Sequence, residues 1–209
     1  MTTLTTLAIA LILEPPPTRV EPVRETLHGV EVVDDYRWLE KLEVDSPEVQ
    51  AWTTEQNDHT RTVLERLSCR KELSSKLERL MTVGSVSAPS MRENLYFYRK
   101  RSGEQNQSVL YVCDGIEGTP RELLDPNQLD EDGLISLDWY VPNHDGSLVA
   151  FGLSRAGDEM STLHVMQTRN GHWLADEIPG KVSLAGWAPD GRAFLYSRLA
   201  DPADAYSRV

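Results

Sequence analysis

The sequence has few cysteines and no long apolar run. Its 209 residues include two cysteines, Cys69 and Cys113, which form no Cys-x-x-Cys motif and have no histidine at metal-ligand spacing. Two isolated thiols fit a reducing compartment better than a disulfide framework. The apolar run at residues 7–13 is seven residues long, whereas about 20 are needed to cross a bilayer. The sequence therefore predicts neither a disulfide scaffold nor a transmembrane helix.

Positive charge is also scarce. The chain has 21 Lys and Arg against 33 Asp and Glu, a formal charge of −12, which argues against nucleic acid and anionic membranes as partners. The first basic residue is Arg19, so the run at residues 7–13 lacks the preceding charge of a secretory signal. We interpret residues 1–14 as an N-terminal extension and expect a cytoplasmic protein, with a periplasmic or secreted location as the alternative if the run acts as a signal.

Motifs for cofactors and metals are missing. No Gly-x-Gly-x-x-Gly or phosphate loop occurs, and the five histidines are dispersed without a His-x-x-x-His pair. The acidic turn at residues 130–133 resembles part of a calcium loop, but Trp139 stands where the twelfth position would need Glu. We therefore predict no cofactor and no metal, and interpret residues 130–133 as a solvated acidic turn.

One motif resembles a catalytic serine. Gly152, Ser154 and Ala156 come one residue short of the Gly-x-Ser-x-Gly nucleophile elbow, which needs a strand, a sharp turn and then a helix. The following residues predict a turn and another strand instead. We therefore place Ser154 in a β-hairpin loop and predict no catalytic residue in this chain.

A repeated phrase is the main positive signal. In residues 139–151 and again in residues 187–196, a Trp leads a Pro-containing turn, then Asp-Gly, then an apolar strand. The two Asp-Gly pairs, at Asp145 and Asp190, are 45 residues apart. A period of about 40–50 residues with short strands and Asp-Gly turns is typical of β-propeller blades.

The first part of the chain has a different pattern. Residues 15–33 are proline-rich and predict an extended segment that ends in a short strand. Residues 34–40 carry two aromatics, a Leu and several charges, which suggests a segment clamped onto another surface. Ser46 and Pro47 predict a helix start, and apolar residues at steps of three and four predict one helix to about residue 67 and a second from about residue 68 to Gly84.

After Gly84 the pattern is that of short strands. They are predicted at residues 95–98, 108–112, 137–141, 148–153, 163–166, 182–187 and 193–197. Residues 83–209 number 127, which is two blades and most of a third, whereas a propeller needs about four blades to close. We therefore predict a mostly β fold with an N-terminal helical segment and an incomplete propeller of about two and a half blades, near residues 83–136, 137–181 and 182–209. On this prediction the chain ends inside its own domain.

Several phrases resemble the prolyl oligopeptidase family in collinear order from about residue 15 to residue 198. They are residues 33–40, 45–48, 51–57, 103–112, 124–127, 132–133 and 187–198. Asp35 departs from the pattern, because the family more often has Pro there. The same variant occurs in the oligopeptidase B branch, which is therefore the subfamily alternative.

The resemblance implies a serine endopeptidase that hydrolyses short peptides after proline. In this family a seven-bladed propeller covers an α/β-hydrolase domain that carries the Ser, Asp and His triad, and the N-terminal segment, here residues 15–82, wraps onto that domain. The triad would follow Val209 in sequence, so this chain by itself is expected to be inactive. The implied partners are the C-terminal α/β-hydrolase domain and proline-containing oligopeptides.

Two residues are assigned to the substrate by resemblance alone. The family often has a Phe before a Ser-x-x-x-Trp phrase that lines the substrate pocket, and alignment on Ser183 and Trp187 puts Val182 there. An acidic residue in the second blade orients a substrate-binding Arg of the hydrolase domain, and Glu159 matches it. A blade-core role for Val182 and a solvated loop charge for Glu159 are the alternatives.

Two other functions fit parts of the pattern. The chain could be a non-catalytic, propeller-derived binding module that assembles with copies of itself, because unpaired strand edges invite association. It could also belong to another propeller enzyme, such as a glycosidase, in which acidic residues act. The helical segment before the blades argues against the glycosidase.

Overall fold

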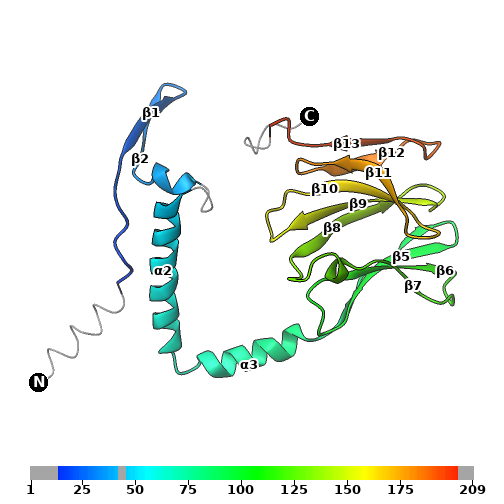
Figure 1. Cartoon of the computed structure of the whole chain (residues 1–209), viewed down its shortest axis with the longest axis horizontal. Helices are drawn as coiled ribbons and strands as arrows, with labels where there is room; N and C mark the ends of the chain where they lie inside the picture. Colours follow the sequence, from blue (N-terminus) through cyan, green and yellow to red (C-terminus); the bar gives the residue numbers. More distant parts are fainter. Residues whose placement is uncertain (1–13, 42–45, 202–209) are drawn as a thin grey trace, which may run out of the picture. The chain divides into compact units, whose positions relative to one another are not determined.

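A computed structural model describes residues 14–41 and 46–201, which belong to two compact units divided between Leu77 and Glu78 (Figure 1). The first unit holds a hairpin and most of the helical residues, and the second holds the sheets. Within the described ranges, no helix is long and apolar enough to cross a membrane.

A two-residue turn forms the hairpin of the first unit. Strands β1 (Val23–Leu27) and β2 (Val30–Asp34) pair antiparallel around His28 and Gly29, whose φ angles are 51° and 82°. Two left-handed residues match the twist of the strands, as in a type I′ turn. Arg37 fixes the hairpin to the following turn, because its Nε lies 2.7 Å from Asp34 Oδ2 and its Nη2 lies 2.8 Å from Glu25 Oε1.

The chain before the hairpin is bonded to helix α2 (Pro47–Glu65). Ser46 caps this helix by accepting from the backbone N–H of Val49, and Pro47 occupies its first turn. Trp52 Nε1 donates to Thr18 Oγ1, and Trp38, in the short turn η1 (Arg37–Glu40), donates to the carbonyl of Arg19. The two indoles meet edge to face at 6.3 Å. Trp38 thus packs inside its own unit, whereas Tyr36, the other aromatic of residues 34–40, is exposed.

Helix α3 (Arg70–Met81) has an apolar stripe without a cover. None of its residues is buried, and the stripe is 53–69% exposed at Leu73, Leu77, Leu80 and Met81. The amphipathic pattern predicted this helix to within two residues at its start. An amphipathic helix normally buries its apolar face, but none of the described residues covers this stripe.

The second unit contains three antiparallel sheets that follow one another in chain order (Figure 1). The first has β3 (Ser85–Val86), β4 (Ser90–Arg92), β5 (Leu95–Arg101), β6 (Val109–Asp114) and β7 (Arg121–Leu124). The second has β8 (Ile135–Pro142), β9 (Leu148–Arg155), β10 (Thr162–Gln167) and β11 (Trp173–Ile178). The third has β12 (Ser183–Trp187) and β13 (Phe194–Ser197). The fold is mostly β, with the consecutive sheets of a partial propeller.

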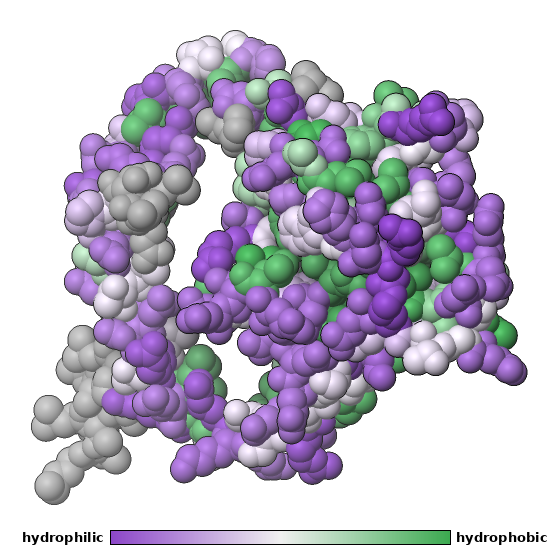
Figure 2. Space-filling view, turned by 45° about the vertical axis from the view of Figure 1, so that its right-hand side comes forward, coloured by the Kyte–Doolittle hydropathy of each residue, from purple (hydrophilic) through white to green (hydrophobic). Residues whose placement is uncertain are grey.

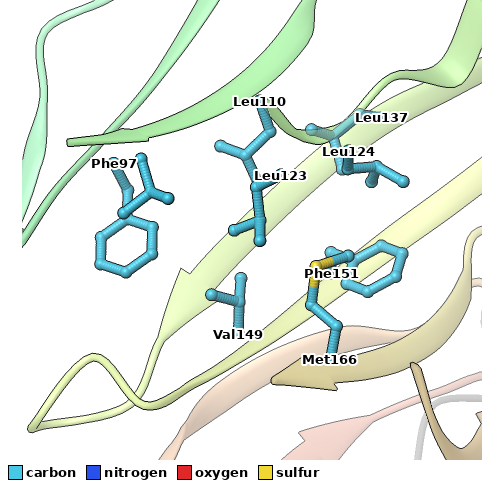
Figure 3. Close-up of a cluster of buried hydrophobic side chains, with 9 residues drawn as sticks. Phe97, Leu110, Leu123, Leu124, Leu137, Val149, Phe151 and Met166 are labelled. Carbon is cyan, nitrogen blue, oxygen red and sulfur yellow. The ribbon is translucent and has the colours of Figure 1, made fainter. Parts of the chain in front are cut away.

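Strand β9 carries the core on both of its faces. Val149 and Phe151 point to the first sheet, where they join Phe97 and Leu110 in one apolar cluster (Figure 3). Ala150 lies in a second cluster with Leu163, Val165 and Val182, toward the third sheet. Successive side chains of a strand point to opposite faces, so an uninterrupted apolar run is the pattern of a strand buried on both sides.

The repeated phrase forms a reciprocal tie between the second and third sheets. Trp139 Nε1 donates to the carbonyl of Val182, and Trp187 Nε1 donates to the carbonyl of Val141, each at 3.0 Å. The Asp-Gly turns are alike as well: Gly146 and Gly191 have φ angles of 70° and 68°. The repeat thus gives each sheet an indole that satisfies a backbone carbonyl of its neighbour.

Three details differ from the sequence prediction. Ser154 lies in strand β9 and not in a hairpin loop, because the strand continues one residue beyond it to Arg155. The sequence did not predict β1, β3, β4, β7 or β11. A short 3-10 turn, η3 (Pro126–Gln128), interrupts the strands, with the Asp125 side chain accepting from the backbone N–H of Asn127.

Candidate functional site

Glu159 lies in the loop of residues 156–161, between β9 and β10. Its φ angle is 57°, and Ala156 has a φ angle of 53°. Residues with a Cβ rarely adopt this left-handed conformation, which costs about 1–3 kcal/mol when the structure imposes it. A loop with two such residues keeps this shape only if its surroundings hold it.

Backbone hydrogen bonds hold the loop at both ends. Ala156 N–H donates to the carbonyl of Leu134, and Val182 N–H donates to the carbonyl of Ser161, each at 2.9 Å. Inside the loop, the Asp158 carboxylate accepts from the backbone N–H of Met160 at 2.9 Å. Glu159 is therefore presented by an ordered turn.

Asp138 is the main side-chain anchor of this loop. Its Oδ1 accepts from the hydroxyls of Ser154 at 2.8 Å and Ser136 at 3.2 Å, and its Oδ2 accepts from the hydroxyl of Ser161. A β-bulge between Leu137 and Trp139 sets Asp138 out of the regular register of β8. Asp138 gives no signal in the sequence, because its partners are spread over 26 positions and share no motif spacing.

The carboxylate of Glu159 has one ion-pair partner in the part of the chain that the structure describes. Lys181 Nζ lies 3.2 Å from Glu159 Oε2, and the Glu159 side chain is 77% exposed. An ion pair this exposed contributes little to stability, about 0–1 kcal/mol. The loop backbone is held, whereas the exposed carboxylate is open to a stronger cationic partner.

Val182 is a buried residue. It is 2% exposed and packs with Ala150, Leu163 and Val165 between the second and third sheets. Its position corresponds to a blade-core residue, and the pocket role assigned by resemblance stays a prediction. Val182 and Glu159 are nevertheless linked, because Val182 follows Lys181 directly and its N–H holds Ser161.

Other residues that drew attention in the sequence have structural partners. Ser154 is 6% exposed and bonded to Asp138, with no histidine among its hydrogen-bond partners. Asp130 accepts from the N–H of Leu134 and pairs with Arg155 at 2.8 Å, so its carboxylate closes a turn. Cys69 and Cys113 are both free thiols. Among the described residues, no group of three or more His, Cys, Asp and Glu side chains could hold a metal ion.

Comparison with known families gives one match. The sequence profile described as "Prolyl oligopeptidase, N-terminal beta-propeller domain" matches residues 15–208. A similar curated protein is the prolyl endopeptidase of Elizabethkingia meningoseptica, which is 30% identical over 193 residues. These residues cover 91% of this chain and 27% of that enzyme, so the chain spans about a quarter of the length of such relatives.

Solved structures are similar over the same part of the chain. One, from a structural and mechanistic analysis of two prolyl endopeptidases, shares 38% identity with a TM-score of 0.78 and covers 91% of this chain and 28% of its own. Oligopeptidase B from Leishmania major has a TM-score of 0.72 over 89% of this chain and 29% of its own, at 17% identity. Because its sequence identity is so low, the similarity to oligopeptidase B shows the fold alone.

Proposed function

The chain belongs to the prolyl oligopeptidase family, with residues 15–208 matching its N-terminal propeller domain, and we propose that it serves as the propeller part of a serine endopeptidase that hydrolyses short peptides after proline. The observation that carries this proposal is the match over nearly the whole described chain. The relatives that share it are named prolyl endopeptidases. No catalytic residue is assigned to the described chain.

We propose that Glu159 contributes to substrate binding. Its carboxylate is exposed and its loop is ordered, which suits a group that orients an arginine from another domain. A guanidinium would form a bidentate pair in place of the weaker contact with Lys181. Val182 is kept as a proposed pocket-lining residue by family resemblance alone, with a blade-core role as the alternative that its burial favours.

The proposed partner is a C-terminal α/β-hydrolase domain, with proline-containing oligopeptides as substrates. The exposed leucines of α3 support it, because monomeric proteins rarely leave such a stripe uncovered. The wrapping of residues 15–82 onto that domain is part of the same proposal. We place the protein in the cytoplasm, with a periplasmic or secreted location as the alternative.

Two alternative functions are each supported by a specific observation. Asp35 and the shared fold favour an oligopeptidase B-like enzyme, which would cleave after basic residues. The exposed apolar faces of the outer sheets favour a binding module that assembles with its own copies. The family match extends over the helical segment as well as the sheets, and so favours the peptidase.

A chimera tests the proposal. Residues 15–208 would replace the matching segment of the Elizabethkingia meningoseptica prolyl endopeptidase, with that enzyme's remaining part alone as the control. We expect the chimera to cleave a proline-containing chromogenic peptide and the control to fail. A fluorophosphonate probe would report the fraction of chimera with a reactive serine.

Glu159 is tested in the same chimera. E159Q should raise KM by about tenfold, as expected for the loss of one charge-assisted contact of about 1.4 kcal/mol, whereas E131Q, an exposed acid elsewhere, should leave KM unchanged. A chimera that labels fully with the probe and still does not cleave would count against the proposed propeller function. An unchanged KM in E159Q would count against Glu159 alone.

A further inference from the structure

The β-bulge in β8 places two consecutive side chains on the face of the second sheet that meets the third. Leu137 and Tyr140 pack in the apolar cluster shared with the first sheet, whereas Trp139 packs against the cluster shared with the third. In a regular strand Asp138 and Trp139 would point to opposite faces. The register shift between Leu137 and Trp139 makes Asp138 an extra residue, so Asp138 and Trp139 point to the same face.

Asp138 joins the Glu159 loop to strand β9. Its carboxylate accepts from the hydroxyl of Ser161, two residues after Glu159, and from the hydroxyl of Ser154 on β9. Ser154 and Ser161 are 6% and 7% exposed, so water has little access to these hydrogen bonds. A buried hydroxyl that loses its partner is costly, and the loop is therefore held to the sheet at Ser161.

Trp139 holds the segment that carries Lys181, the ion-pair partner of Glu159. Its Nε1 donates to the carbonyl of Val182, and the N–H of Val182 donates to the carbonyl of Ser161. Lys181 and Glu159 have φ angles of 54° and 57°. Because residues with a Cβ are strained in this left-handed region, they keep it only while the chain around them is held. The two side chains at the bulge thus hold both halves of the ion pair.

We propose that Asp138 is a positioning residue for substrate binding, which acts through Glu159 by holding its loop in the left-handed conformation. This inference rests on the proposed function, in which Glu159 orients an arginine of the hydrolase domain. A bidentate carboxylate–guanidinium pair requires a defined geometry, so a loop that also samples other conformations presents Glu159 correctly for only part of the time. The apparent affinity for substrate then falls with the fraction of competent loop.

Amide hydrogen exchange of the whole chain gives the first test. D138A should speed exchange of the Val182 N–H about tenfold, because this N–H is bonded to the carbonyl of Ser161 in the released loop. D145A is the matched control, since Asp145 also accepts from a serine, Ser147, but in the turn at the opposite end of β9. D145A should leave exchange at Val182 unchanged. Equal exchange at Val182 in D138A and the wild type would overturn the proposal.

Kinetics of the chimera give the second test. D138A should raise KM about fivefold and leave kcat per labelled serine within about twofold of the wild type. On the E159Q background D138A should raise KM no further, because Asp138 acts through Glu159. D138N should keep the wild-type KM, since its amide oxygen can accept from Ser154 and its NH₂ can donate to the Ser161 hydroxyl. S161A removes only the bond between Asp138 and the loop, and should raise KM as well if D138A folds poorly.

Three kinetic results would overturn the role of Asp138 in a chimera that cleaves. These are an unchanged KM in D138A and S161A, effects of D138A and E159Q that multiply, and a D138N variant as impaired as D138A. The last result would mean that the charge of Asp138 matters and not the loop geometry. A wild-type chimera that labels fully and does not cleave would instead overturn the proposed function, and exchange at Val182 then decides whether Asp138 holds the loop.

Discussion

At the scale of single residues, His164 is the titratable group most changed by its packing in the neutral pH range. Its ring stacks on Phe151 at 5.6 Å between centroids and lies 4.9 Å from Trp173. Burial lowers the pKa of His164, and Glu177, its cross-strand partner on β11, opposes this effect only in part. The neutral ring is therefore the form that the second sheet favours.

This packing predicts a pH dependence of stability. Above the ordinary histidine pKa of about 6.5, both folded and unfolded chains have a neutral ring, and the stability is fully present. As pH falls below that value the unfolded chain takes up a proton first, so stability is lost until the lowered folded pKa is reached. Urea unfolding at pH values from about 7.5 to 5.5 should show this loss in the wild type and a smaller one in H164Q.

His144 supplies the control, because it is exposed in the turn after β8. H144Q should keep the wild-type dependence on pH. If H164Q and H144Q lose stability equally as the pH falls, the packing of His164 does not set its protonation. A ¹³C or ¹⁵N titration of the ring would then place its pKa at or above the ordinary value.

At the scale of elements, the close approach of β8 and β9 depends on one glycine. A Cβ on Gly152 would lie 2.3 Å from Trp139 Nε1 and 2.5 Å from Trp139 Cε2, so the indole could not keep its bond to Val182. We predict that G152A lowers the free energy of unfolding by about 1–3 kcal/mol, the usual cost of overpacking a core.

Gly186 in β12 is the matched control for this substitution, since a Cβ there would meet nothing within 4 Å. G186A should change the free energy of unfolding by less than about 0.5 kcal/mol. Urea denaturation followed by tryptophan fluorescence measures both. Equal effects of the two substitutions would mean that the indole moves aside at little cost.

The sequence predicted the central strands because both of their faces are apolar. Residues 148–153 and 163–166 were recognised, and they form most of β9 and β10. Strands β7 and β11 were missed, since their exposed positions carry charges that weaken an apolar pattern. Each of these two lies at the edge of its sheet, where one side of the strand faces solvent.

The candidate site was harder to predict than the strands. Glu159 was found only through the family resemblance, and its ordered loop depends on Asp138, whose three serine partners come from separate segments. Local spacing predicts elements, whereas the Glu159 loop depends on contacts between residues that are brought together by the register between strands.

At the scale of the whole molecule, the outer sheets have uncovered apolar faces. Val86 and Ile116, on the first sheet's side, are 65% and 85% exposed, and Leu195 on the third sheet is 75% exposed. Figure 2 shows apolar residues at the surface of the sheet-forming unit, among hydrophilic ones. Among the described residues of this unit, the two buried apolar clusters join the second sheet to the first and to the third.

These faces predict how the isolated chain behaves in solution. Exposed apolar surface and unpaired strands favour non-specific contacts, so sedimentation velocity should show a weight-average mass that rises continuously with concentration. I116K together with L195K should reduce this association at equal concentration, because both changes place charge on the open faces. A matched pair on the exposed hairpin of the first unit, V30K with V23K, should have a smaller effect. A single discrete oligomer that persists on dilution would instead favour the self-assembling binding module, in which the two open faces recognise each other.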